Sequence, residues 1–115
     1  MKLYLAKKVL ATNGKPVQMR DEENGPLRDA TIRDILVNLL GAQAATADAK
    51  GGFLLWRISE MAQDATKGEL DLNLKLSDAL LKLAKNPVAA NGQSLMPQSH
   101  QAQLLLACGL TEEDL

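Results

Sequence analysis

The chain has 115 residues, a formal net charge of −1 and a single cysteine, Cys108. This length is typical of one domain that buries enough surface for a core. The charge excludes a global attraction to nucleic acid or to membranes, and a lone cysteine excludes an intramolecular disulfide. Aromatic residues make up only 3% of the chain, so we expect an aliphatic core, which favours helix packing.

The N-terminal segment carries the pattern of a β-hairpin. Leu3, Leu5 and Val9 share one parity of the chain, with Tyr4, Ala6 and Lys8 on the other, which indicates a strand. A two-residue loop would place the apolar side chains of the two strands on opposite faces. A three-residue loop over 12–14 instead sets Val17 opposite Val9, and Gly14 then takes the left-handed conformation of a bulged turn. We therefore predict the three-residue loop.

The clearest helix begins after a polar loop over residues 20–28. Asp29 or Thr31 can cap its start, and Gly41 is expected to end it. The apolar stripe of this helix follows the spacing i, i+3, i+4, i+7, i+8 and consists of Ile32, Ile35, Leu36, Leu39 and Leu40. We expect this stripe to be buried against the second and fourth helices and the hairpin.

The second helix is predicted over residues 53–65, after a break at Gly51-Gly52. Residues 69–76 then alternate leucine with polar residues, which predicts a half-buried strand or an extended segment. Ser77 would cap a short third helix that ends before Pro87.

The fourth helix is expected to begin near Pro97 and to close at Gly109, with Leu110 packing back over its last turn. The predicted fold is α+β and mostly helical, with an N-terminal β-hairpin and a short third strand packed on about four helices. We interpret the chain as a single domain with a hairpin over 1–19, a helical body over 29–110 and a mobile acidic tail over 111–115.

Residues that could carry catalysis or hold a cofactor are few. His100 and Cys108 would lie about 12 Å apart on one helix, too far for a nucleophilic pair. The adjacent carboxylates of 21–23 lack the spacing of a calcium loop and are interpreted as solvated. No phosphate-binding, nucleophile-elbow or zinc motif is present. We therefore expect no catalytic, metal or cofactor site.

Four residues are candidates for binding a partner: Trp56, Tyr4, Lys7 and Lys8. A lone tryptophan is a typical hot spot of protein interfaces. The lysines of the hairpin could contact nucleic acid, but they serve equally well to protect a strand edge from aggregation. An unpaired edge of the hairpin or of 69–76 also offers main-chain hydrogen bonds to another chain.

The layout resembles small proteins encoded by tailed phages and prophages. These begin with a short Lys/Leu strand and an Asn-Gly-x-Pro turn, followed by helices with an alternating segment between them. The segments that carry the resemblance are Met1–Val9, Asn13–Val17, Ala30–Leu40, Glu69–Leu72 and Gln101–Leu106. The chain departs from that layout by an insertion from Asp21 to Arg28. The resemblance implies a bacterial host cytoplasm and a role in phage assembly or regulation, and it transfers no site residues.

These observations favour a non-enzymatic protein that interacts with a protein partner or with itself, such as an assembly factor. The first alternative is a small regulatory protein that binds nucleic acid through the basic hairpin, and the second is an enzyme with an unrecognised carboxylate site. No apolar run approaches the roughly 20 residues that span a bilayer, and the N-terminus lacks the pattern of a signal peptide. We therefore expect a cytoplasmic protein with no membrane partner.

Overall fold

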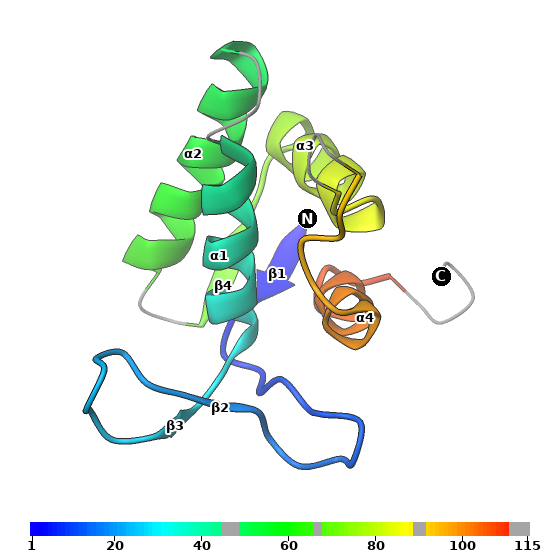
Figure 1. The fold of residues 1–115 in the computed structure, drawn as a ribbon. Coiled ribbons are helices and arrows are strands. Elements are labelled where there is room, and N and C mark those ends of the chain that lie inside the picture. Colours follow the sequence, from blue (N-terminus) through cyan, green and yellow to red (C-terminus); the bar gives the residue numbers. More distant parts are fainter. Residues whose placement is uncertain (45–48, 66–67, 89–91, 111–115) are drawn as a thin grey trace.

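Four helices and two small antiparallel sheets form the described part of the chain in the computed structural model, which covers residues 1–44, 49–65, 68–88 and 92–110 (Figure 1). The helices are α1 (Ile32–Ala44), α2 (Ala49–Asp64), α3 (Leu74–Lys85) and α4 (Gln98–Ala107). The strands are β1 (Lys2–Tyr4), β2 (Gln18–Met19), β3 (Arg28–Asp29) and β4 (Glu69–Asp71). The prediction of a mostly helical α+β fold is confirmed. The predicted mobile tail over 111–115 lies outside the described residues.

Helix α1 lies at the centre of the fold. It packs against α2 and α4, and α3 closes the group by contacting the same two helices. In Figure 1, α1 and α2 run in opposite directions, so the start of α1 lies beside the end of α2. The sheet of β1 and β4 lies behind α1, and the β2–β3 ladder extends beyond the N-terminal end of α1 (Figure 1).

The predicted turn of the hairpin is confirmed. Leu10 bridges to Pro16, and the amide of Val17 donates to the carbonyl oxygen of Val9 at 2.8 Å. Gly14 has a φ of +79°, as the three-residue loop requires. A Cβ on this residue would meet nothing within 4 Å, so only its backbone conformation favours glycine.

The partner of the first strand differs from the expected one. β1 pairs antiparallel with β4, with Leu3 opposite Leu70, instead of continuing the hairpin into β2. The second arm turns away because Gln18 pairs with Asp29 in the β2–β3 ladder. Residues 69–71 therefore do form a third strand of the N-terminal region, next to β1 and not next to the second arm of the hairpin.

Three glycines expected to interrupt helices lie inside them. α1 continues through Gly41 to Ala44, and α2 begins at Ala49 and runs through Gly51 and Gly52. A glycine in a helix costs only about 1 kcal/mol relative to alanine, so the tertiary packing of an apolar stripe can override it. The expected ends of these two helices were therefore wrong by several residues.

The third helix also begins earlier than expected. β4 ends at Asp71, and Asn73 caps α3 by accepting a hydrogen bond from the amide of Leu76 at 2.9 Å. Ser77, the expected cap, is buried in the first turn, where its hydroxyl donates to the carbonyl oxygen of Leu72. The leucine alternation therefore spans a strand, a cap and a helix start, and Leu74 is 78% exposed.

The end of the fourth helix matches the prediction. Gly109 has a φ of +91°, and its amide donates to the carbonyl oxygen of Leu106 at 3.0 Å. The amide of Leu110 donates to the carbonyl oxygen of Leu105, which completes a Schellman motif. Leu110 packs against the core, as expected.

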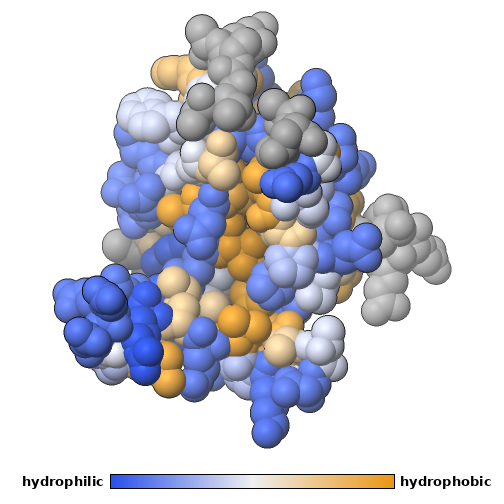
Figure 2. Space-filling view, viewed as in Figure 1, coloured by the Kyte–Doolittle hydropathy of each residue, from blue (hydrophilic) through white to orange (hydrophobic). Residues whose placement is uncertain are grey.

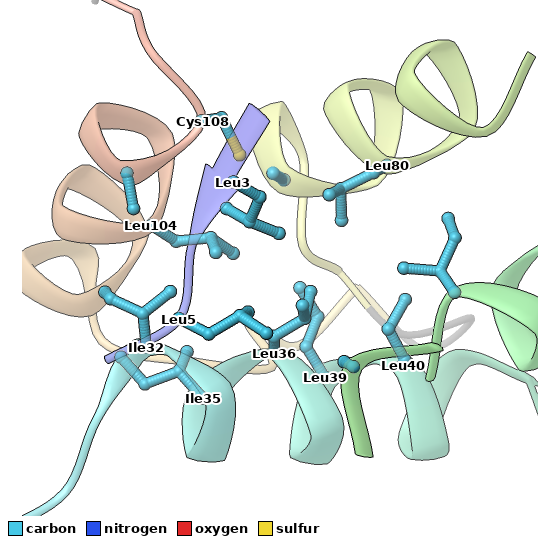
Figure 3. Packing of buried hydrophobic residues seen from close by; sticks show 14 of the residues in the cluster. Leu3, Leu5, Ile32, Ile35, Leu36, Leu39, Leu40, Leu80, Leu104 and Cys108 are labelled. Atoms are coloured by element: carbon cyan, nitrogen blue, oxygen red, sulfur yellow. The ribbon is translucent and has the colours of Figure 1, made fainter. Parts of the chain in front are cut away.

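The core is aliphatic and draws on both sheet and helices (Figure 3). Leu3 and Leu5 point toward the stripe of α1, while Leu80 of α3 and Leu104 of α4 close the far side. The predicted burial of the stripe and of the first strand is confirmed for Leu3, Leu5, Val9, Ile32, Ile35, Leu36, Leu39 and Leu40. Each such side chain contributes about 1.5–3 kcal/mol by leaving water.

Candidate functional site

The four candidate partner-binding residues lie on three segments of the fold. Trp56 lies on α2, Tyr4 in β1, and Lys7 and Lys8 in the segment that follows β1. The side chains of all four are exposed. The ammonium of Lys8 lies 3.1 Å from the carboxylate of Asp29, so part of the positive charge of the hairpin is already neutralised.

The chain contains one Phe, one Trp and one Tyr, and all three rings lie at the surface. The exposed fractions are 60% for Phe53, 52% for Trp56 and 49% for Tyr4. Single exposed apolar side chains are common on protein surfaces, whereas adjacent ones form an apolar patch. Trp56 and Tyr4 were candidates from the sequence, and Phe53 was not.

Phe53 and Trp56 form a pair on the outer face of α2, hereafter the α2 aromatic pair. Their ring centroids lie 6.2 Å apart with an interplanar angle of 41°. Residues three apart lie on one face of a helix, so this spacing was a signal that sequence reasoning could have used. Arg57 and Glu60 follow on the same helix and form an ion pair of 2.6 Å. The α2 aromatic pair therefore forms an apolar centre with charged residues at its border, as many protein interfaces do.

A groove of about 630 Å³ lies between α2 and α3. Leu54, Leu55 and Leu83 supply apolar walls, and Lys75 and Lys82 of α3 lie at its border. Because Leu54 and Leu55 belong to the same helix as the α2 aromatic pair, α2 offers apolar surface on more than one side.

A second depression, of about 280 Å³, lies between α1, the β2 region and the start of α4. Figure 2 shows apolar surface along the hollow in the middle of this face, with polar residues on both sides. Its apolar walls include Ile35, Leu39 and Met96, and His100 lies at its border. The sequence placed His100 on the surface or at a boundary, which agrees with its partial exposure.

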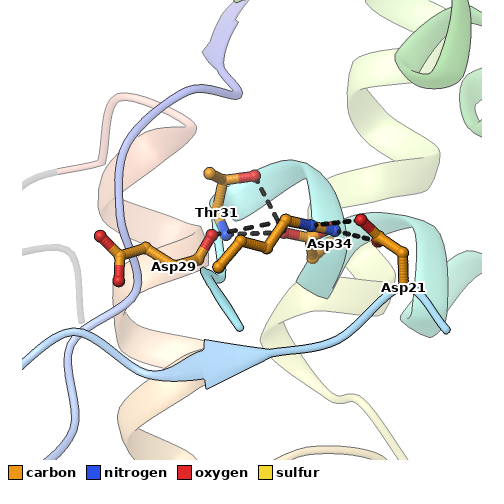
Figure 4. Close-up of polar contacts among 5 residues, drawn as sticks. Asp21, Asp29, Thr31 and Asp34 are labelled. Atoms are coloured by element: carbon orange, nitrogen blue, oxygen red, sulfur yellow. Dashed lines mark hydrogen bonds and ion pairs between the residues drawn. The ribbon is translucent and has the colours of Figure 1, made fainter. Parts of the chain in front are cut away.

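Arg28 links the polar loop to the first turn of α1 through Asp21 and Asp34, and Figure 4 shows the side chains of these two carboxylates within the network. Its guanidinium donates to the carboxylate of Asp21 at 2.9 and 2.8 Å and to that of Asp34 at 2.9 and 2.7 Å. Asp34 also accepts from the amide of Thr31 at 2.7 Å and from its hydroxyl at 3.1 Å. Thr31 thus precedes the helix as expected, but the carboxylate of Asp34 does the capping.

These contacts set the charges of the network. The hydrogen bonds from Arg28, together with those from Thr31, hold the pKa of Asp34 below its ordinary value. The hydrogen bond from Arg28 likewise lowers the pKa of Asp21. Residues 21–23 are exposed, as expected for solvated carboxylates, and Asp21 in addition accepts hydrogen bonds from Arg28. The guanidinium of Arg28 and the carboxylates of Asp21 and Asp34 hydrogen-bond to one another, so we interpret this network as structural.

The arrangement around Cys108 offers no nucleophile. Its thiol is buried at the C-terminal end of α4, and burial raises its pKa to about 11. His100 lies in the first turn of the same helix, at the opposite end. A thiol with this pKa is almost entirely protonated near neutral pH, and the thiolate is the reactive form.

Among the residues that the structure describes, no group of three or more His, Cys, Asp or Glu side chains could hold a metal ion. No helix there is both long and apolar enough to cross a bilayer.

The sequence matches no known family model. Comparisons with curated proteins and with solved structures likewise found no significant match.

Proposed function

We propose that this chain is a non-enzymatic interaction or assembly protein that binds another polypeptide through the α2 aromatic pair. The observation that carries the proposal is the exposure of all three aromatic rings of the chain. Phe53 and Trp56 lie side by side, so burying them together would remove a continuous apolar surface from water. Aromatic anchors of this kind dominate the binding energy of many protein interfaces.

The resemblance to small phage and prophage proteins supports a biological setting for this role. It favours a protein that works in the cytoplasm of a bacterial host, in phage assembly or in regulation. The charge pattern supports protein over nucleic acid as the partner. The net charge is −1, and Lys8 of the basic hairpin is paired with Asp29.

Photo-crosslinking tests the proposal directly. A benzoylphenylalanine replaces Trp56, and the control variant carries it at Thr12, an exposed residue of the hairpin loop. We expect a discrete crosslinked product in the native host from position 56 and none from position 12. A product of twice the mass of the chain would identify a second copy as the partner, and any other discrete mass would identify a different protein.

A second variant shows whether the neighbouring ring takes part. Phe53→Ala in the crosslinker background should weaken the product at least severalfold, because the two rings form one surface. The proposal fails if position 56 gives no discrete product, or if positions 56 and 12 give the same products.

A further inference from the structure

A pocket of about 360 Å³ lies where the start of α1 meets the end of α2, away from the α2 aromatic pair. One wall carries a guanidinium, two side-chain amides provide further hydrogen-bonding groups, and two apolar side chains complete the lining. These residues, with one neighbouring carboxylate, are Arg33, Asn38, Gln63, Met19, Val37 and Asp34.

Arg33 is a half-buried cation. Its Nη2 donates to the carbonyl oxygen of Ala65, while its Nε is buried and has no acceptor among the described residues. Among the residues that the structure describes, no carboxylate lies within ion-pair distance of Arg33. Arg28, the other partly buried arginine, contacts two carboxylates. Burial removes hydration from a charge, so a buried cation normally gains a paired anion in return.

The neighbouring carboxylate of Asp34 does not fill this role. Its oxygens accept hydrogen bonds from Arg28 and from Thr31, so its charge is already compensated. Asp34 nevertheless leaves a negative group in the wall of the pocket, and that group would repel a doubly charged anion more strongly than a singly charged one. The pocket is therefore better suited to a carboxylate than to a phosphate.

We propose that this pocket binds a single carboxylate on a short apolar stem, the chemistry of a glutamate side chain or of a small monocarboxylic metabolite. The guanidinium of Arg33, which lines the pocket, binds the carboxylate, and the amides of Asn38 and Gln63 hydrogen-bond to its oxygens or to polar groups beside it. Met19 and Val37 contact the methylene groups of the stem. The site is independent of the α2 aromatic pair, so the failure of one proposal leaves the other standing.

Nuclear magnetic resonance with ¹⁵N-labelled full-length protein tests the site. The Nε–H signal of Arg33 and the backbone amides of the lining residues are followed during titration with N-acetylglutamate, which is used throughout as its α-amide so that the side-chain carboxylate is its only charge. N-acetylglutamine, likewise used throughout as its α-amide, serves as the neutral control of the same shape, and inorganic phosphate serves as the competing anion. We expect a saturable shift with N-acetylglutamate and a dissociation constant of about 1 mM, as is typical of a ligand of this size.

The controls separate charge from shape. N-acetylglutamine and phosphate should each bind at least tenfold more weakly than N-acetylglutamate. Equal shifts with the glutamate and glutamine compounds, tighter binding of phosphate, or no saturable shift would each overturn the proposal. A glutamate-containing peptide that binds much more tightly than N-acetylglutamate would indicate a protein as the source of the carboxylate, whereas equal affinity would indicate a small molecule.

Two variants test the residues themselves. Arg33→Gln should abolish the saturable shift. Because Arg33 also contacts Ala65, Gln63→Glu provides a test that keeps the arginine in place. It adds a carboxylate at the pocket wall, so it should compete with N-acetylglutamate and weaken its binding at least tenfold. Gln98→Glu, the same change at an exposed position of α4, should leave the affinity within about twofold. Unchanged binding to Gln63→Glu would overturn the proposal.

Discussion

Replacing Asp34 with alanine should destabilise the fold more than replacing Asp21, although both carboxylates pair with the same guanidinium. The Asp34 side chain is 16% exposed and also caps α1 through Thr31, whereas that of Asp21 is 67% exposed and contacts Arg28 alone. Loss of a capping acceptor costs about 0.5–2 kcal/mol, and solvent screens the exposed part of the ion pair. We expect Asp34→Ala to lower the free energy of unfolding by about 1–2 kcal/mol.

Urea melts of the wild type and of both variants at about pH 7 measure this difference, with Asp21→Ala as the matched control. Repeating them at acid pH checks the cause. The pKa of Asp34 is lowered in the folded state, so its stabilisation is complete above the pKa of the unfolded carboxyl. It is lost as the pH falls through the lower folded pKa, and the wild type and Asp34→Ala should then converge between about pH 4 and pH 2. Equal losses in the two variants, or a gap that acid does not close, would show that the carboxylate of Asp34 does not act as a cap.

Three further predictions use matched pairs or simple binding assays. Leu36→Ala should lower the free energy of unfolding by about 2–5 kcal/mol because Leu36 is fully buried, whereas Asn38→Ala, on the exposed side of α1, should lower it by less than about 1 kcal/mol. Equal losses in urea melts would mean that the buried face of α1 is misassigned. Gly14→Ala should destabilise the protein by about 1 kcal/mol because Gly14 has a positive φ, whereas Gly41→Ala should stabilise it by about 0.5–1 kcal/mol because Gly41 lies in a helix with open space around it. Thermal melts in which both variants shift the melting temperature in the same direction would contradict this. The chain should not bind generic duplex DNA with submicromolar affinity at physiological salt, since its net charge is −1, and fluorescence anisotropy across a salt series would reveal such binding.

The sequence predicted what depends on local spacing. The stripe of α1, the turn at Gly14 and the closure of α4 at Gly109 follow from neighbours a few residues away. Each of these features satisfies a local requirement, such as an apolar face or a positive φ. Such requirements can be recognised without knowing the rest of the fold.

The features that the sequence did not predict depend on distant partners. Nothing near Leu3 indicates that Leu70 lies opposite it, because alternation identifies a strand without naming its neighbour. The strand-like alternation also concealed the cap at Asn73, since the buried Leu72 and Leu76 fit a strand and a helix start equally well. Asn73 itself was the signal that could have placed the start of α3, because asparagine is among the best capping residues.

The candidate surfaces were predictable only in part. Trp56 was selected for its rarity, and the structure shows that it is exposed beside Phe53. Arg33 was not a candidate from the sequence, because the groups around its guanidinium depend on which side chains α2 brings near it. Whether a carboxylate of the described residues lies beside a charged group can be recognised only once the fold is known.

The pairing of β1 with β4 has a consequence for synthesis on the ribosome. Lys2 is made well before its partner Asp71, which emerges only after α1 and α2 have been translated. Until then Leu3 and Leu5 lie on a strand whose partner has not been made. The unpaired backbone groups of such an edge can form hydrogen bonds with other chains. The turn around Gly14 and the helices can form from local contacts in the meantime. The pairing of β1 with β4 must therefore wait until residues 69–71 have been made, and a chain that stalls before Glu69 should be prone to aggregate.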